Sequence, residues 1–201
     1  NYQLAKAYAM DGRLDESTQM LERLIAMDAD PMILSEAYFR HAERAFSDAD
    51  YALAERGYGS VVALGQAFPF FDNAVYMRGW SQFKLGRYQA SLNAFTQVLD
   101  MMATQAGSLN QVEGAKKNLM LDTLRVMALA FSYLEGSETI RQTYTRLGER
   151  PYNDRLYAEL GDLYLSKRRY RDSANTYRRY VEYFPESDAA PDFSVRTIDV
   201  Y

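Results

Sequence analysis

The side chains that could carry out catalysis are few in this chain of 201 residues. His41 is the only histidine, and there is no cysteine. A catalytic histidine works beside a nucleophile and an orienting carboxylate, and the sequence around His41 offers no such arrangement. Helical spacing instead places His41 at a packing position beside Ala42. Thiol catalysis, zinc fingers and disulfides are excluded, so we predict no catalytic residue and no enzyme activity.

Two pairs of carboxylates have the spacing found in calcium loops. They are Asp28 with Asp30 and Asp48 with Asp50. Neither pair is followed by the glycine and the distant glutamate that complete such a loop. Both stand where helix caps and turns favour Asp. Since Gly57–Tyr58–Gly59 reads as a close-packed part of a helix and not as a phosphate loop, we predict neither metal nor cofactor.

Two further groups of side chains have the chemistry of partner binding. The first is aromatic, recurs at helical spacing, and consists of Phe39, Phe46, Tyr76, Trp80 and Phe83. Aromatic side chains that line a groove anchor a partner segment well; the alternative is that neighbouring helices cover them as core. The second group is basic and consists of Lys167, Arg168, Arg169, Arg171, Arg178 and Arg179. This basic patch could contact anionic lipid, nucleic acid or an acidic partner, and the alternative is a solvated turn.

A repeated pair of helices positions these groups. Small residues stand where two helices cross, as at Gly161 and Ser173, with large apolar residues beside them and Pro185 at the exit. The same spacing occurs upstream at Gly79 and Ser91. A period of about 34 residues with this pattern is typical of a helix-turn-helix repeat. We therefore predict an all-α protein.

The repeat divides the whole chain. We predict one solenoid segment over 1–201, with a further helix at 189–201. The period breaks at 103–119, which reads as an elongated helix end or an irregular insertion. The predicted units are about 2–29, 31–66, 73–102, 120–150 and 154–185. Because the chain begins at Asn1, within a helical pattern, and ends within another, we interpret it as part of a longer protein.

These motifs resemble the tetratricopeptide repeat (TPR) superfamily. The resemblance implies a right-handed α-solenoid of about five units plus a terminal helix, with a concave groove lined by the first helix of each unit. A ligand mode of this superfamily clamps a C-terminal carboxylate with Lys, Asn and Arg. Of the corresponding groove residues here, Lys6 alone fits that mode; the others are Tyr2, Phe39, Glu43, Tyr76 and Trp80.

Two junctions are similar to those of bacterial cell-envelope repeat proteins. They are 68–74 and 184–191, each containing Phe-Pro. The envelope proteins that have similar junctions are the Tol-system cell-division coordinator and the lipoprotein of the outer-membrane assembly machine. The resemblance therefore implies a periplasmic or envelope-associated protein, with a cytoplasmic location as the alternative.

Charge and hydropathy limit the partners. The net charge of −4 argues against nucleic acid, which binds to basic surfaces. Residues 1–55 carry 5 basic and 11 acidic side chains, whereas residues 141–179 carry 10 basic and 5 acidic. No apolar run is long enough to span a membrane.

We predict a non-catalytic scaffold that holds a protein or peptide along an aromatic groove. A structural spacer within a longer repeat protein is the alternative. A third reading is that the repeats recruit a catalytic domain elsewhere in the protein.

Overall fold

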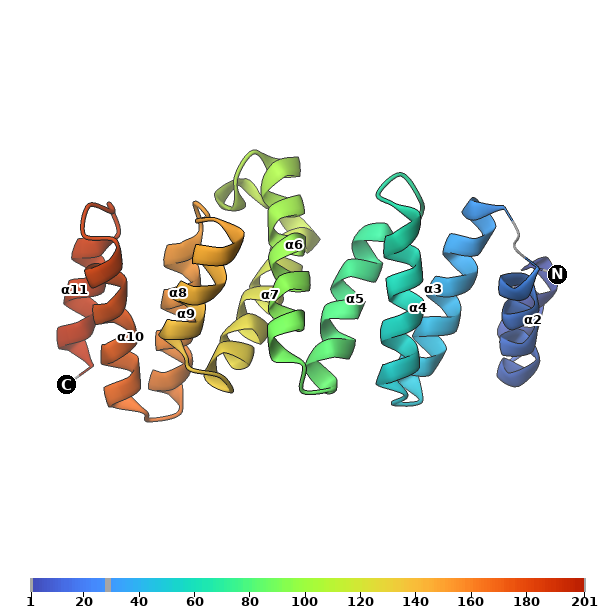
Figure 1. Ribbon diagram of the computed structural model, residues 1–201, viewed down its shortest axis with the longest axis horizontal. Helices are drawn as coiled ribbons and strands as arrows, with labels where there is room; N and C mark the ends of the chain where they lie inside the picture. Colours follow the sequence, from blue (N-terminus) through green and yellow to red (C-terminus); the bar gives the residue numbers. More distant parts are fainter. Residues whose placement is uncertain (1, 28–29, 201) are drawn as a thin grey trace. The chain divides into compact units, whose positions relative to one another are not determined.

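The computed structural model describes residues 2–27 and 30–200, and this part of the chain contains eleven α-helices, one short 3-10 helix and no strand (Figure 1). The all-α prediction is confirmed, and the helix count matches five pairs plus a terminal helix.

Two compact units, 1–101 and 102–201, make up the chain. Unit 1 contains α1 (Tyr2–Met10), α2 (Leu14–Ala26), α3 (Pro31–Ser47), α4 (Tyr51–Leu64), α5 (Phe71–Lys84) and most of α6 (Tyr88–Ala106). Unit 2 contains η1 (Leu109–Gln111), α7 (Gly114–Ser132), α8 (Ser137–Leu147), α9 (Asn153–Ser166), α10 (Tyr170–Tyr183) and α11 (Ala190–Asp199).

The turn inside a helix pair has one geometry in four of the pairs. In each, a backbone N–H just after the turn donates to a carbonyl five residues earlier, for example Asp50 N to Ala45 O at 2.9 Å and Arg169 N to Tyr164 O at 2.8 Å. This 6→1 bond ends the first helix, and in these four pairs a left-handed residue stands just before the donor, as is usual for such a bond. The residues in that conformation are Gly12, Ala49, Gly86 and Arg168.

Ala49 therefore occupies a backbone conformation that favours glycine, with φ of 62°. Its side chain is exposed. Ala49→Gly is expected to raise the free energy of unfolding by roughly 0.5–1 kcal/mol, because glycine adopts the left-handed region without strain. Urea denaturation followed by circular dichroism measures this. Ala52→Gly, inside α4, should change stability in the opposite direction; a loss at both positions would contradict the strain at Ala49.

Close helix crossings depend on small residues. An added Cβ at Gly57 would lie 2.8 Å from Ala42 Cβ, one at Gly79 would lie 2.9 Å from the Phe95 ring, and one at Gly161 would lie 2.1 Å from Tyr177. Contacts under 3.0 Å force a neighbour to move. The close packing predicted at Gly57, Gly79 and Gly161 is thus present.

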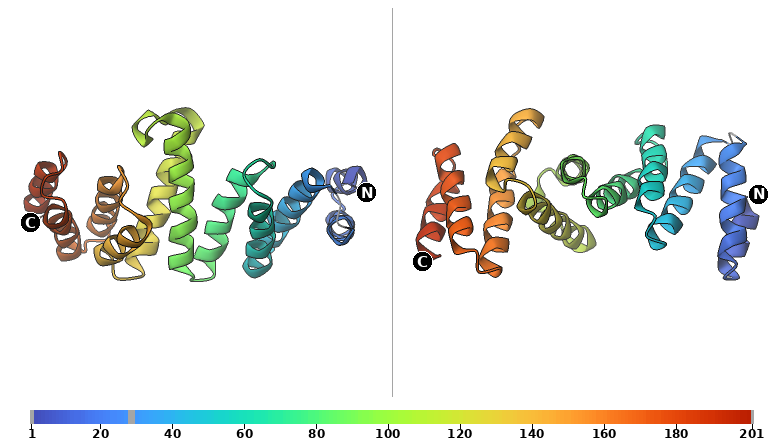
Figure 2. Two further views of the ribbon diagram at one scale, coloured as in Figure 1. Left: turned by 45° about the horizontal axis from the view of Figure 1, so that its top comes forward. Right: turned by 60° about the horizontal axis from the view of Figure 1, so that its bottom comes forward.

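The core of unit 1 lies between consecutive helices. The α3–α4–α5 layer buries Phe39, Ala42, Tyr58 and Val61, and α1, α2 and α3 bury a second cluster that includes Leu21. The predicted caps are present for α3 and α4: the Asp30 side chain accepts from Met32 N, and Asp50 accepts from Leu53 N, both at 2.9 Å. Asp28 and Ala29 lie outside the described residues. The helices α3 and α4 lie side by side in every view (Figure 2).

Aromatic rings fill the core of unit 2. Tyr180 stacks on Phe193 of α11 with ring centroids 4.1 Å apart, and Tyr157 meets Tyr180 edge to face at 5.4 Å. Tyr177 is 1% exposed, and its hydroxyl donates to Asp162 at 2.6 Å. The terminal helix α11 thus packs on α10 through Phe193.

The stretch 103–119 is largely helical, which agrees with an elongated helix end and not with an irregular insertion. The second helix of the third pair extends to Ala106, and α7 begins at Gly114 and not near Met120. Between them, the short helix η1 is held by buried Leu109 and Val112. Gly107 and Gly114 interrupt the sequence pattern; Gly107 directly follows α6, Gly114 is the first residue of α7, and both have a positive φ.

Candidate functional site

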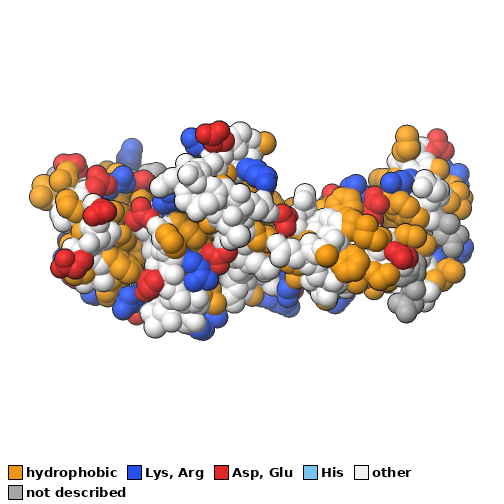
Figure 3. Space-filling view, turned by 90° about the horizontal axis from the view of Figure 1, so that it is seen from above, with side chains coloured by type: hydrophobic (Ala, Val, Ile, Leu, Met, Phe, Trp, Pro, Cys, Tyr) orange, Lys and Arg blue, Asp and Glu red, His pale blue; other side chains and the backbone are white. Residues whose placement is uncertain are grey.

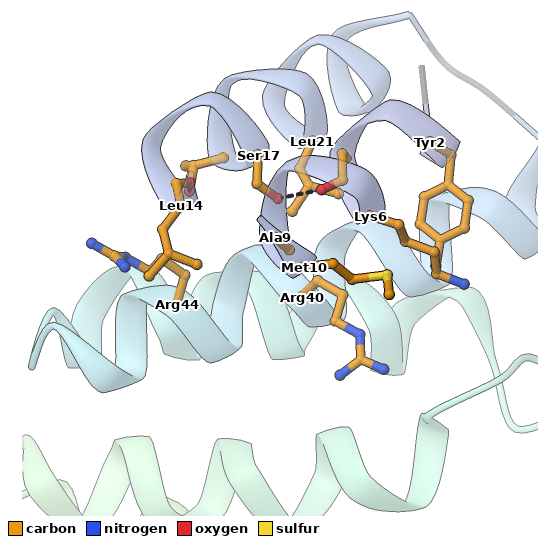
Figure 4. Close-up of a pocket in the computed structure, with 11 residues that line it drawn as sticks. Tyr2, Lys6, Ala9, Met10, Leu14, Ser17, Leu21, Arg40 and Arg44 are labelled. Atoms are coloured by element: carbon orange, nitrogen blue, oxygen red, sulfur yellow. Dashed lines mark hydrogen bonds between the residues drawn. The ribbon is translucent and has the colours of Figure 1, made fainter. Parts of the chain in front are cut away.

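A pocket of about 380 Å³ lies in unit 1 between α1, α2 and α3 (Figure 4). Its apolar lining is Ala5, Ala9, Met10, Leu14 and Leu21, and its polar lining is Tyr2, Lys6, Ser17, Thr18, Arg40 and Arg44. Figure 4 shows Ala9 and Met10 of α1 and Leu14 of α2 above the helix that carries Arg40 and Arg44. The exposed surface of the hollow is mainly apolar although six polar residues line it, and a concave apolar surface with convergent polar groups is the usual form of a binding site.

The apolar part of the pocket is open to solvent. Met10 is 90% exposed and Leu14 is 44% exposed, whereas Ala5 and Leu21 are buried at its base. The Ser17 hydroxyl donates to the Ala5 carbonyl at 2.8 Å and ties α2 to α1 (Figure 4). An apolar side chain of a partner would cover Met10 and Leu14 and gain the hydrophobic stabilisation that they lack in the free chain.

Three cations surround this apolar surface, and each has a carboxylate neighbour within the chain. Lys6 Nζ lies 3.4 Å from Glu36, Arg40 lies 2.7 Å from Glu43, and the Arg44 Nε lies 2.6 Å from Asp48. All three cations remain partly exposed. Exposed ion pairs are worth about 0–1 kcal/mol, so these cations can exchange partners at little cost. Burial and the neighbouring Glu36 raise the pKa of Tyr2.

The five aromatic residues predicted to line a groove do not share one environment. Phe39 is 4% exposed, with its ring 4.7 Å from that of Phe70 and 5.5 Å from that of Tyr58. The prediction that Phe39 is an exposed anchor is therefore wrong, because α4 and the 65–70 loop cover its ring. Phe46 is half-buried against the same cluster and meets Tyr51 at 5.2 Å.

The other three aromatic residues form a continuous strip on α5. Trp80 is half-buried, with ring centroids 6.4 Å from Tyr76, 5.7 Å from Phe83 and 6.0 Å from Phe95. Tyr76 and Phe83 are half-buried as well. Hydrophobic side chains also gather on the face of unit 1 seen in Figure 3. The strip on α5 thus leaves part of each ring in contact with solvent.

The basic patch lies on the turn between α9 and α10 and on α10, in unit 2. All six residues are exposed. Arg169 pairs with Asp172 at 2.7 Å and lies over the Tyr164 ring, while Arg178 and Arg179 both pair with Glu182. The others are Lys167, Arg168 and Arg171, for which the described part of the chain shows no ion pair. Nearby, burial first and Asp162 second raise the pKa of Glu159.

His41 is on α3 and its side chain faces α2, where its Nε2 is 3.4 Å from Glu22 Oε1. This agrees with a packing position. Within residues 2–27 and 30–200, no group of three or more His, Cys, Asp or Glu side chains is placed to hold a metal ion. The helices in these ranges are also too short or too polar to cross a membrane.

Comparison with known families decides the repeat type. Residues 73–101 and 154–187 each match a model of the tetratricopeptide repeat. These two segments are similar to the tetratricopeptide repeat. The matched TPR segments coincide with the third and fifth helix pairs, where Gly79 and Gly161 make the close crossings.

Solved structures are also similar to the chain, and one with a TM-score of 0.50 shows a shared fold. One is the C-terminal part of a TPR repeat-containing protein from Cytophaga hutchinsonii, with a TM-score of 0.50 and 14% identity over 100% of this chain and 79% of that one. Another is a putative kinesin light chain with nearly identical TPR-like repeats from Podosopora anserina, with a TM-score of 0.49 and 15% identity over 99% of this chain and 92% of that one. No curated protein matches the sequence. The envelope relatives suggested by the two Phe-Pro junctions have no support among these findings.

The sequence prediction did not include the pocket. The predicted groove residues of the second helix pair are Phe39 and Glu43, whereas the structure brings their neighbours Arg40 and Arg44 to the cavity that Lys6 also lines. Arg40 and Arg44 stand four residues apart on α3 and so share one helix face. The four-residue spacing of Arg40 and Arg44 was the sequence signal that could have predicted this basic face of α3.

Proposed function

We propose that this chain is a non-catalytic scaffold that binds a partner polypeptide across α1, α2 and α3 of unit 1. TPR repeats generally mediate protein–protein interactions and are generally scaffolds without catalytic activity. The observation that carries the proposal is the open pocket between α1, α2 and α3, which combines exposed Met10 and Leu14 with three exchangeable cations.

The partner segment inserts an apolar side chain between Ala9, Met10 and Leu14. Lys6, Arg40 and Arg44 donate hydrogen bonds to carbonyl or carboxylate oxygens of the same segment, since ammonium and guanidinium groups are donors only. The strip of Tyr76, Trp80 and Phe83 on α5 offers a second apolar contact, because partly exposed aromatic residues are frequent anchors at interfaces. The partner is therefore a peptide with an apolar anchor and acidic neighbours.

Filling the pocket tests this function. Panning a random peptide library on the immobilised chain selects ligands, and their affinities are then measured with an Ala9→Phe variant. Ala9 is exposed on α1 and lines the pocket, so the added ring occupies the site without entering the core. We expect binding to weaken about tenfold or more, which corresponds to about 1.4 kcal/mol.

Ala7→Phe is the matched control. Ala7 is exposed on the same helix but does not line the pocket, so its affinities should equal those of the unchanged chain. Trp80→Ala reports the contribution of the α5 strip. Equal binding by the Ala9→Phe and Ala7→Phe variants would place the interaction elsewhere, and a library without any ligand would favour the structural spacer.

A cell-envelope location is also proposed, on the two Phe-Pro junctions alone. Fractionation of the source cells, with the full-length protein detected by antibody, tests it. Recovery in the cytosol would reject this location and leave the scaffold function unaffected.

A further inference from the structure

Two turns meet at one edge of unit 2. They are the turn between α7 and α8 and the turn between α9 and α10, both at the lower edge in Figure 1. The two turns approach each other through Tyr164, because a Cβ added at Gly136 would lie 2.8 Å from the Tyr164 hydroxyl oxygen. The guanidinium carbon of Arg169 lies 4.3 Å from the centroid of the same ring. Residues 133–136 and 165–171 therefore form one surface, which we call the turn edge.

Large apolar side chains are exposed along the turn edge. Among the described residues of unit 2, six large hydrophobic side chains are exposed, and four of them belong to this edge. Tyr133 is 58% exposed and Tyr170 is 47% exposed. Leu134, in the first turn, and Leu165, at the end of α9, are each 39% exposed. Because the turns stand at the ends of their helices, these side chains are placed to enter an apolar medium.

The turn edge is also positively charged. Three of its exposed cations have no ion pair within the described part of the chain, and these are Lys167, Arg168 and Arg171. Arg169 is paired with Asp172 at 2.7 Å. Glu135 is the one carboxylate among residues 133–136 and 165–171. The edge therefore attracts an anionic surface.

The helix pair itself does not require a cation at this turn. Arg168 has a positive φ of 58°, a conformation that favours glycine. In the first and third helix pairs the equivalent residues are Gly12 and Gly86. Glycine thus serves the same turn, so the guanidinium of Arg168 belongs to the surface and not to the fold.

We propose that the turn edge docks on the surface of an anionic lipid bilayer. The unpaired cations lie against the lipid phosphates, since ammonium and guanidinium groups are attracted to an anionic leaflet. Leu134 and Leu165 enter the boundary between headgroups and acyl chains, where buried apolar area strengthens binding. Tyr133 and Tyr170 place their rings at the same boundary and keep their hydroxyls among the headgroups.

The exposed leucine side chains favour a bilayer over nucleic acid. A phosphate backbone would attract the same cations, but it offers Leu134 and Leu165 no apolar medium. A bilayer surface takes up both kinds of side chain. The turn edge lies in unit 2 and shares no residue with the pocket between α1, α2 and α3, so this proposal is independent of the peptide-binding function.

Cosedimentation with lipid vesicles tests the proposal. The unchanged chain should bind vesicles that mix phosphatidylglycerol with phosphatidylcholine, should not bind phosphatidylcholine alone, and should bind less as salt is added. Arg168→Gly should weaken binding about fivefold, which is the usual effect of one cation at an anionic surface. It should also keep the fold, because glycine suits the positive φ at this turn. Replacing both Leu165 and Tyr170 by Ser should weaken binding about tenfold.

Lys117→Ala is the matched control for charge. Lys117 is exposed near the beginning of α7, roughly 20 Å along the helix from the turn edge. Since this exceeds the Debye length of about 8 Å, binding should not change. An equal loss with Lys117→Ala and Arg168→Gly would show diffuse attraction and overturn docking by the turn edge.

Three other results would overturn the bilayer assignment. One is the absence of binding by the unchanged chain to vesicles with phosphatidylglycerol. Another is full binding by the double Ser variant at Leu165 and Tyr170, which would mean that charge alone is recognised. The third is tighter binding to a labelled single-stranded oligonucleotide than to the vesicles, which would assign the turn edge to nucleic acid.

Discussion

Gly161→Ala is expected to lower the free energy of unfolding of unit 2 by about 3 kcal/mol, because the site has no room for a methyl group. The added Cβ would lie 2.1 Å from Tyr177 Cε1 and 2.6 Å from Tyr177 Cζ. The Tyr177 ring cannot easily withdraw, since it is 1% exposed, contacts Phe193 at 5.8 Å and is tied to Asp162 through its hydroxyl. Urea denaturation followed by circular dichroism measures the loss.

Two comparisons isolate the cause. Gly59→Ala, also inside a helix, meets only Arg78 Nε at 3.8 Å and should stabilise by up to about 1 kcal/mol through helix propensity. In a Tyr177→Leu background the cost of Gly161→Ala should shrink, because the ring that it strikes is gone. A gain at Gly161 similar to that at Gly59 would show that the helices α9 and α10 are not in close contact there.

Raising the pH from 10 to 12 is expected to destabilise unit 2 by about 2 kcal/mol through Tyr177 alone. Burial, and then the hydrogen bond to Asp162, raise the pKa of Tyr177 from 10.0 to about 12. The folded state thus favours the neutral phenol. The stabilising contribution of Tyr177 is complete below pH 10 and is lost as the pH rises through 12. Burial also raises the pKa of Tyr157, which adds to the loss.

Measuring the free energy of unfolding at neutral pH, pH 10 and pH 12 tests whether stability falls as the pH rises. Tyr177→Phe should be less stable at neutral pH, because the bond to Asp162 is lost, and should lose less between pH 10 and pH 12. Tyr170→Phe is the matched control, since Tyr170 lies on α10 and is 47% exposed; its pH dependence should follow that of the unchanged chain. Equal pH dependence in all three proteins would reject Tyr177 as a source of the alkaline loss.

The helical repeat was predictable from sequence because its signals are local. Turn residues such as Gly12 and Gly86, the cap at Asp50, and small residues such as Gly161 each act within one or two helices. The spacing of apolar residues along one helix identifies the face of that helix that is apolar. The same local reasoning left 103–119 open between a longer helix and an insertion, because a glycine can mark either. The structure places Gly107 just after α6 and Gly114 at the start of α7.

The binding surfaces depend on how separate helices approach, and helical spacing does not specify that approach. Phe39 and Tyr76 occupy equivalent first-helix positions, three residues before Ala42 and Gly79, yet Phe70 covers Phe39 while Tyr76 stays half-buried. Lys6 and Arg40 are far apart in sequence and meet at one pocket only because α3 packs on α2. The sequence by itself determined the all-α repeat fold, its turns and its small crossing residues. Only the tertiary structure decided which side chains are covered and where cavities remain, because burial is set by neighbouring helices.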